Sequence, residues 1–325
     1  MSDLPRERGQ LPTGIQEGTG LEKERDELGS AAVAVAIVNS EIDEVKPSYE
    51  EARSRSDWLK WKEAIDVELK NLEDAKTWEV VERLDGVNVV DSKWVFRLKK
   101  DAEGKVLKWK ARLVARGFTQ IYGMDYFETF APVARLASIR LILAIAVRND
   151  WNISMFDFHS AYLNGVLDEG ETIYMEQPPH HEIVDRTRYV VKLNKSLYGL
   201  KQAGRKWYNT LCHSLASIGF RKSMVDPAVF YAVVEQDIVV LFIHVDDSTI
   251  TGSSLALNKK FMSRIAEHFE ITDLGPISWL LGLAVVRDQD KQTISLSQSA
   301  YIESLLRRFN LEDTKTLTVP INSNV

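Results

Sequence analysis

Three aspartates carry the chemistry that this sequence suggests. Asp157 lies near the end of the apolar run 153–158, which is typical of a buried strand, and Asp246 and Asp247 follow the apolar run 239–244. A carboxylate at a strand end that faces an aspartate pair on a hairpin turn can offer three oxygen ligands to two hard cations. Magnesium suits such a site because waters and substrate phosphates supply its other ligands. Two ions about 4 Å apart can activate an attacking hydroxyl and stabilise the leaving oxygen of an in-line displacement.

The same aspartate pair has a simpler interpretation, because Asp-Asp between two strands is more often a plain turn than a metal site. At a separation of about 4 Å and an effective dielectric of about 20, each close pair of carboxylates costs about 4 kcal/mol in repulsion. Such a cluster therefore needs bound cations to hold it together. The three residues alone leave both interpretations open, and the choice depends on what surrounds them.

Basic residues are concentrated in two stretches of an otherwise acidic chain. The net charge is −6, yet residues 93–120 carry +7 and residues 186–222 carry +9, which leaves −22 for the rest. This segregation predicts a basic track that binds phosphate, since local charge and not the total governs such binding. Two solvated basic faces are the alternative.

Apolar periodicity places these residues on secondary structure elements. We expect residues 1–44 to form a disordered leader and an amphipathic helix to begin at Ser56, since Trp58, Trp61, Ile65 and Leu72 recur at helical spacing. Alternating residues predict strands at 78–81, 93–98 and 106–114, and the last two form a hairpin around the turn residues 101–104. On that hairpin Lys110 and Arg112 are two residues apart and therefore project from one face.

The second half of the chain continues this alternation. Helices are predicted at 137–147, 203–218, 261–269 and 300–309, and the first is apolar nearly all round, as a buried helix would be. Strands are predicted at 153–158, 189–193, 228–234 and 238–244, with a further hairpin at 279–286 and 293–296. The fold class is therefore α+β, with helices packed on an antiparallel sheet.

Composition excludes several classes of protein. The chain has 325 residues, of which 45% are apolar and 27% charged, so it can bury a substantial core. Its longest aliphatic run, 31–38, is far shorter than the roughly 20 residues of a membrane span, and the N-terminal stretch lacks the pattern of a signal peptide. Cys212 is the single cysteine, which excludes an intramolecular disulfide and a multi-cysteine zinc site. We predict an intracellular protein, in a cytoplasmic particle or the nucleus, that is not secreted and does not bind membranes.

An ordered set of short motifs narrows the function further. The motifs are Lys93–Phe96, Lys110–Gln120, Glu128–Val133, Asp157–Gly165, Ser196–Gln202 and Val245–Asp247, followed by Leu281–Gly282, Leu296–Gln298 and Ala300–Ile302. Each string is weak alone, but the ordered set is very specific. In this order and at this spacing the motifs resemble those of the copia-type reverse transcriptases of LTR retrotransposons, and the resemblance covers about Pro47 to Pro320.

The resemblance implies a right-hand polymerase fold with fingers and palm and with the thumb incomplete or absent. On this interpretation a reverse transcriptase domain covers residues 45–320. The fingers take about 45–133 and 171–203, the palm takes about 134–170 and 204–288, and the start of a thumb or connection takes about 289–320. Residues 321–325 are a tail.

The resemblance also assigns roles to individual residues. Asp157, Asp246 and Asp247 match the catalytic, metal-binding carboxylates, which would hold two Mg²⁺ or Mn²⁺ ions. Lys110 and Arg112 match the hairpin that grips the incoming triphosphate, and which of them touches phosphate stays open. Tyr162 falls where such enzymes carry a bulky residue that rejects the ribose 2′-hydroxyl, with a core tyrosine as the alternative. Lys201 and Gln202 lie in the nucleotide-contacting loop, or are plain surface residues. Leu281–Val286 matches the strand pair that steadies the primer end, although core packing explains these residues equally well.

The implied reaction is RNA-directed DNA synthesis, with an RNA template, a DNA or RNA primer and dNTPs as partners. Two departures from the family pattern favour a different outcome, a remnant that keeps the fold and at most binds nucleic acid. His244 stands where the family has an aromatic residue, and Gly204 stands where it usually has proline. The ribonuclease H and integrase parts of a Pol polyprotein are not in the sequence, so we expect a fragment. A different metal-dependent phosphotransferase is hard to reconcile with the ordered motifs.

Overall fold

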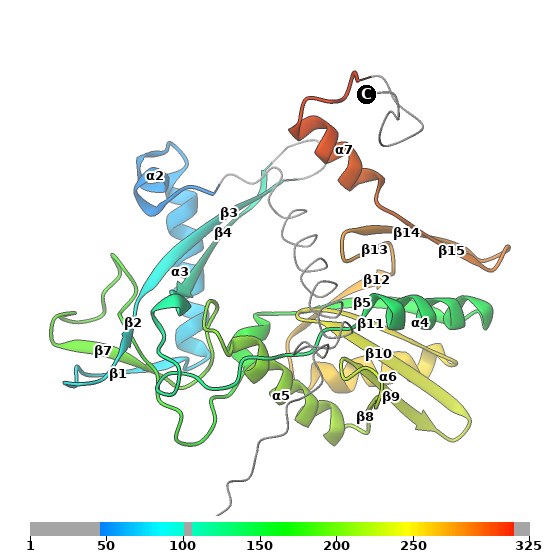
Figure 1. Cartoon of the computed structure of the whole chain (residues 1–325), viewed down its shortest axis with the longest axis horizontal. Coiled ribbons are helices and arrows are strands. Elements are labelled where there is room, and N and C mark those ends of the chain that lie inside the picture. Colours follow the sequence, from blue (N-terminus) through cyan, green and yellow to red (C-terminus); the bar gives the residue numbers. More distant parts are fainter. Residues whose placement is uncertain (1–45, 101–105, 315–325) are drawn as a thin grey trace, which may run out of the picture. The chain divides into compact units, whose positions relative to one another are not determined.

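The computed structural model describes residues 46–100 and 106–314 (Figure 1). The backbone divides into two compact units, one of residues 43–280 and 284–297 and the other of residues 1–42, 281–283 and 298–325. Helix α7 (Ser299–Arg308) is the described helix of the second unit. The predicted leader 1–44, the hairpin turn 101–104 and the tail 321–325 lie outside the described residues.

Two helices begin the described chain. Helix α2 (Tyr49–Ser54) starts with a capping box, in which the Ser48 hydroxyl accepts the Glu51 N–H and the Glu51 carboxylate accepts the Ser48 N–H. Helix α3 (Trp58–Asp74) buries Trp61, Ile65 and Leu72 on one face. The predicted amphipathic helix is therefore confirmed, and the short α2 before it was missed.

A long hairpin packs against α3 (Figure 1). Its strands are β3 (Ser92–Lys100) and β4 (Val106–Ala115), which pair antiparallel with Arg97 opposite Lys110. The 3-10 turn η1 (Gly117–Thr119) follows β4. A small sheet packs into the same apolar core, with strand order β1 (Trp78–Glu82), β7 (Tyr189–Leu193), β6 (Tyr174–Met175) and β2 (Val89–Val90). The predicted hairpin is confirmed.

A six-stranded antiparallel sheet forms the second core of the larger unit. Helices α5 (Ala203–Ser217) and α6 (Leu255–Ala266) cover one of its faces, where Phe156, Trp207 and Phe261 are buried together. The 3-10 turn η2 (Ala161–Asn164) packs against α5. The observed antiparallel sheet with packed helices confirms the predicted α+β class. The strand order is β12 (Ile271–Pro276), β5 (Asn152–Phe158), β11 (Asp247–Gly252), β10 (Asp237–His244), β9 (Val229–Val234) and β8 (Arg221–Lys222).

Helix α4 (Leu136–Arg148) differs from the prediction of a helix buried on all sides. It buries Ile139 and Leu143, but Leu141 is 61% exposed and Ile145 is 40% exposed. The helix touches β5 and β15 (Thr293–Ser297), and the described residues cover only that side of it. Apolar composition alone therefore overestimated its burial. Strand β15 pairs with β14 (Leu283–Asp288), which follows β13 (Trp279–Leu280), so the predicted C-terminal hairpin is confirmed.

Candidate active site

The six-stranded sheet brings the three predicted aspartates together. Asp157 on β5 lies directly opposite Asp247 on β11, and Asp247 also pairs with His244 at the end of β10. Asp246 is in the two-residue turn between these strands. One carboxylate oxygen from each aspartate lies within 4.8 Å of the others. The arrangement is the predicted one, with a strand-end carboxylate facing an aspartate pair on a hairpin turn.

The surrounding backbone fixes the turn that carries Asp246. Val245 has a positive φ of 64°, which is costly for a β-branched residue and indicates that neighbouring contacts impose it. The indole N–H of Trp207 on α5 donates to the Val245 carbonyl at 2.7 Å, and the Phe158 N–H donates to the Asp246 carbonyl at 3.2 Å. Both carbonyls of the turn are thus bonded to groups that belong to the packed core.

Electrostatics make the cluster unfavourable without a counter-charge. Burial first, and then the charges of Asp246 and Asp157, raise the pKa of Asp247 to about 6. A hard divalent cation accepts carboxylate oxygens and removes this repulsion. The donor set, its spacing and the repulsion among its carboxylates therefore fit a divalent metal, with Asp157, Asp246 and Asp247 as the ligands.

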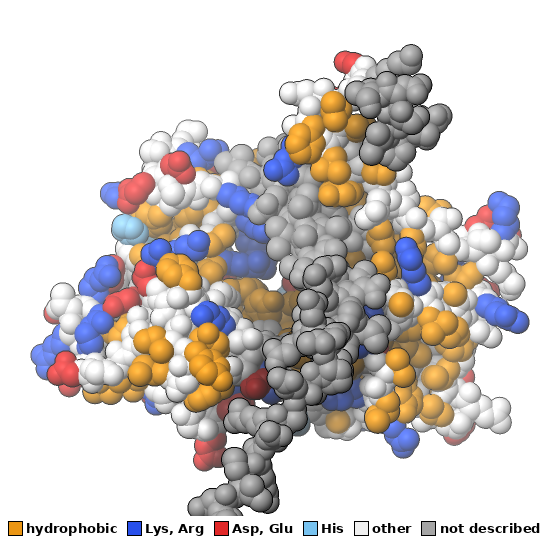
Figure 2. Space-filling view, viewed as in Figure 1, with side chains coloured by type: hydrophobic (Ala, Val, Ile, Leu, Met, Phe, Trp, Pro, Cys, Tyr) orange, Lys and Arg blue, Asp and Glu red, His pale blue; other side chains and the backbone are white. Residues whose placement is uncertain are grey.

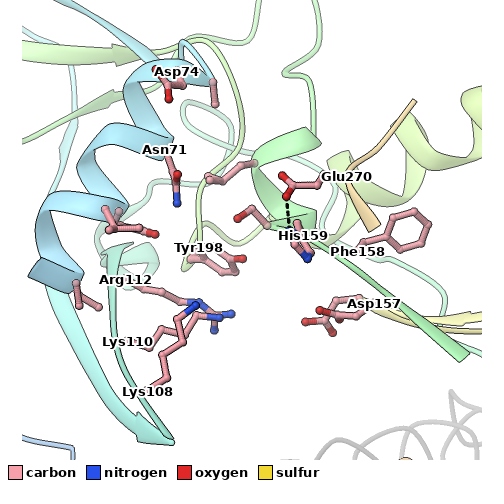
Figure 3. Close-up of a pocket in the computed structure, with 18 of the residues that line it drawn as sticks. Asn71, Asp74, Lys108, Lys110, Arg112, Asp157, Phe158, His159, Tyr198 and Glu270 are labelled. Atoms are coloured by element: carbon pink, nitrogen blue, oxygen red, sulfur yellow. Dashed lines mark ion pairs between the residues drawn. The ribbon is translucent and has the colours of Figure 1, made fainter. Parts of the chain in front are cut away.

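A cleft of about 990 Å³ opens next to the cluster, and basic side chains line its opposite wall. Lys108, Lys110 and Arg112 extend from β4 toward the side on which Asp157 lies (Figure 3). The rest of the cleft lining comes from helix α3 and from the end of β5, together with His159, which follows β5. One cleft thus combines an acidic cluster with a row of cations, which suits a phosphate-bearing substrate that also binds metal.

Lys and Arg side chains are concentrated on the part of the molecule that carries the β3–β4 hairpin and the small sheet (Figure 2). The first basic stretch contributes three cations, Lys108, Lys110 and Arg112, to the cleft. The second stretch, 186–222, does so only through Lys195. Five of its nine cations pair with carboxylates outside the stretch, and four of these five partners come from distant segments, which a charge count along the chain does not register. The pairs are Arg186–Glu182, Arg188–Glu82, Lys192–Glu79, Arg205–Glu128 and Lys206 with Asp168 and Glu171.

Comparison with known proteins decides the family. Residues 75–323 match the family described as reverse transcriptase (RNA-dependent DNA polymerase). The chain belongs to this reverse transcriptase family. It is 38% identical to the Retrovirus-related Pol polyprotein from transposon TNT 1-94 of Nicotiana tabacum over 280 residues, which is 86% of this chain and 21% of the relative.

Two further relatives support the assignment. The Pol polyprotein from transposon RE1 of Arabidopsis thaliana is 37% identical over 81% of this chain and 18% of the relative. The Transposon Ty1-LR2 Gag-Pol polyprotein of Saccharomyces cerevisiae is 30% identical over 66% of this chain and 12% of the relative. The reverse transcriptase chain thus spans about a fifth or less of these relatives. The resemblance to copia-type elements seen in the motifs is confirmed.

The remaining predicted nucleotide-binding residues, Tyr162, Lys201 and Gln202, do not line the cleft. Tyr162 is half-buried between the two apolar cores, its ring edge-on to Tyr198 at 5.3 Å, and burial followed by the Asp246 charge raises its pKa. The Lys201 ammonium lies 4.4 Å above the Tyr126 ring. Gln202 is 1% exposed, and its amide hydrogen-bonds to Gln120, the Asp125 carbonyl and Glu171, so it is a buried structural residue and not a surface one.

The two departures from the family pattern are both in packed surroundings. Burial lowers the pKa of His244, and among the described residues its Nε2 has no hydrogen-bond partner. Gly204 lies in the first turn of α5, where an added Cβ would meet the Ala131 side chain at an ordinary 3.5 Å. Neither residue displaces the aspartates from one another.

Sequence reasoning missed two residues that shape the cleft. Glu68 on α3 is 8% exposed, and its carboxylate accepts the Leu113 N–H of β4 at 3.3 Å. The Tyr198 ring lies 4.5 Å below the Arg112 guanidinium. Glu68 occupies a buried position in the helical pattern of α3, so a charged residue at that position was the signal in the sequence that could have identified it.

Among the described residues no helix is long and apolar enough to cross a membrane.

Proposed function

We propose that this chain is an RNA-directed DNA polymerase that transfers dNTPs to a primer 3′-hydroxyl by a two-metal mechanism. One observation carries the proposal: three carboxylate oxygens lie within 4.8 Å of one another in a cleft whose opposite wall presents Lys110 and Arg112. The description of the family as RNA-dependent DNA polymerase supports RNA as the template and DNA as the product. Acyl or glycosyl transfer gives no reason for three clustered aspartates facing a row of cations.

The three aspartates would hold the metal ions. Asp157, Asp246 and Asp247 would bind two Mg²⁺ or Mn²⁺ ions, which supply activation of the attacking hydroxyl and stabilisation of the leaving oxygen. The β5–β11 register fixes Asp157 against Asp247, and the Trp207 and Phe158 hydrogen bonds fix the Asp246 turn. The ligands are therefore already in place before substrate arrives, which lowers the cost of forming the reactive arrangement.

The cations of β4 bind the triphosphate. Lys110 and Arg112 offer positive charge and N–H donors to phosphate oxygens, and guanidinium groups make paired hydrogen bonds to such anions. We assign the β3–β4 hairpin with α3 to the fingers and the six-stranded sheet to the palm. Tyr162 then lies below the sugar of the incoming nucleotide, where its ring excludes a ribose 2′-hydroxyl.

A second candidate function is a remnant that binds nucleic acid without catalysis. It is favoured by His244, whose buried Nε2 has no partner among the described residues, in the strand that leads to Asp246 and Asp247. The two candidates differ in one measurable property, which is extension of a primer.

Primer extension on a homopolymer RNA template with magnesium or manganese separates them. The polymerase is expected to extend, to stop in excess EDTA and to lose extension in Asp246→Asn, which removes one ligand charge at nearly constant size. Asp85→Asn, an exposed change in the loop between β1 and β2, is the matched control and should extend normally. Extension that survives EDTA would refute the metal mechanism. Template binding without any extension would favour the remnant.

A further inference from the structure

Tyr198 lies in the motif Ser196–Gln202 and lines the cleft, but neither the motif nor the family comparison gives this residue a role of its own. Its ring lies 4.5 Å from the Arg112 guanidinium carbon on one side and 5.3 Å from the Tyr162 ring on another. Ser160 lines the same cleft, close to the Tyr198 hydroxyl. Ser160 follows Asp157 by three residues and has a left-handed backbone, with φ of 48°. Tyr198 thus contacts both the cationic wall and the segment that leaves the catalytic strand (Figure 3).

The backbone of Tyr198 is docked on the end of β4. The Ala115 N–H donates to the Tyr198 carbonyl at 2.8 Å. Gly199 follows with φ of 88°, and a Cβ at this glycine would collide with the Ala115 carbonyl oxygen. Only glycine permits both the conformation and the close approach. The ring therefore has a fixed position relative to Arg112, which lies three residues before Ala115 on the same strand.

Glu68 holds the same strand from the helix side. Its buried carboxylate accepts the Leu113 N–H, next to Arg112 in the chain, and its charge interacts favourably with Arg112 and Lys110. Among the described strands β4 pairs only with β3. The N–H groups on its other edge therefore have no partner strand to accept them, and the Glu68 carboxylate serves one of them. Helix α3 and Tyr198 together restrict where the Arg112 guanidinium can lie.

We propose that Tyr198 is a positioning residue for nucleotide binding, which holds the Arg112 guanidinium over its ring and toward the aspartate cluster. This inference rests on the proposed function, since it takes Arg112 as a ligand of the triphosphate. A free arginine has many rotamers and loses most of them when it binds phosphate. An aromatic face that already attracts the guanidinium restricts its rotamers before phosphate binds, so less conformational entropy is lost on binding. The N–H groups at the edge of the guanidinium stay available to the phosphate.

A double-mutant cycle tests the inference. The measured quantity is the dissociation constant of dTTP for the full chain with magnesium, a poly(rA) template and a primer that ends in a dideoxynucleotide, so that no turnover occurs. Tyr198→Leu should weaken dTTP binding about fivefold, the change that a contact of about 1 kcal/mol converts to. Tyr198→Phe keeps the ring and should stay within about twofold of wild type. In an Arg112→Ala background, Tyr198→Leu should have little further effect.

The outcomes separate this inference from the proposed function. If Arg112→Ala weakens binding but Tyr198→Leu weakens it by the same factor in both backgrounds, Tyr198 does not act through Arg112 and the inference is overturned. If wild type does not bind dTTP, or Arg112→Ala has no effect, the proposed nucleotide site fails as well. Tyr198→Met retains apolar volume without a ring. It should reproduce the leucine result, and a wild-type affinity in a folded Tyr198→Met chain would also overturn the inference.

Discussion

Replacing Asp247 by asparagine should make the metal-free chain more stable, although it removes a proposed catalytic group. The pKa of Asp247 is raised to about 6 from an ordinary 3.8, chiefly by burial and then by Asp246 and Asp157. The folded state therefore holds the Asp247 proton at pH values where the unfolded chain has released it. Through this group, stability falls as the pH rises from about 4 to about 6, and the full cost is present above that.

The size of the effect follows from the shift. Each pKa unit corresponds to about 1.4 kcal/mol, so a shift of roughly two units gives an upper limit of about 3 kcal/mol. Asp247 is only partly buried, and solvent screens part of the repulsion, so about 1–2 kcal/mol is expected. For a unit of this size each kcal/mol moves Tm by about 2–4 °C. Asp247→Asn should therefore raise the metal-free Tm by a few degrees at pH 7.5 and by nothing at pH 4.

The assay is thermal unfolding of wild type, Asp247→Asn and the control Asp85→Asn, at both pH values and with EDTA or excess magnesium. Magnesium should raise the Tm of wild type at pH 7.5 because it binds the folded state. The variant lacks one ligand charge, so magnesium should raise its Tm by less. The Tm difference between Asp247→Asn and wild type should therefore shrink or change sign when magnesium is added. An asparagine variant that is less stable than wild type at pH 7.5 in EDTA would refute the repulsion on which the metal assignment depends.

Three further outcomes are expected. Changing both Lys110 and Arg112 to alanine should weaken template-primer and nucleotide binding and reduce the slope of log affinity against log salt concentration, measured by titration; an unchanged slope would mean that these cations do not contact phosphate. In Tyr162→Val, the ratio of kcat/KM for ribonucleotides to that for deoxyribonucleotides should rise, and an unchanged ratio would make Tyr162 a core residue. Gly204→Ala should raise the free energy of unfolding by about 0.5–1 kcal/mol in denaturant titration, since the Cβ has room; a loss of stability would show that the glycine conformation is required.

Local pattern predicted most of the longer elements and the positions of the three aspartates, and the ordered motifs assigned the aspartates their catalytic role. Helical spacing placed α3, alternation placed β3 and β4, and two apolar runs placed Asp157 and the Asp246–Asp247 turn at strand ends. These features depend on residues close in the chain, or on strands that pair in a register set by their own apolar faces. The strands β2, β6 and β8 were missed, because each is two residues long and a run of two residues is too short to show an alternating pattern.

Contacts between distant segments account for what the sequence did not predict. The stretch 186–222 counted as basic, but Lys206 is buried against Asp168 and Glu171 from a separate loop. Gln202 is likewise buried, with its amide bonded to Gln120 and Glu171. Charge counted along the chain cannot register a partner that arrives from another segment.

These buried polar contacts also explain how residues that do not line the cleft can still affect it. Lys206 and Gln202 attach the start of α5 to Glu171, and Lys201 donates its backbone N–H to Gln120. The same loop, a few residues earlier, presents Tyr198 to Arg112. A buried amide or ammonium that loses its partner is costly, so these contacts resist displacement. The residues after Tyr198 therefore fix the loop to the scaffold. Substitutions at Gln202 should consequently alter nucleotide binding through the position of Tyr198, without any contact between Gln202 and nucleotide.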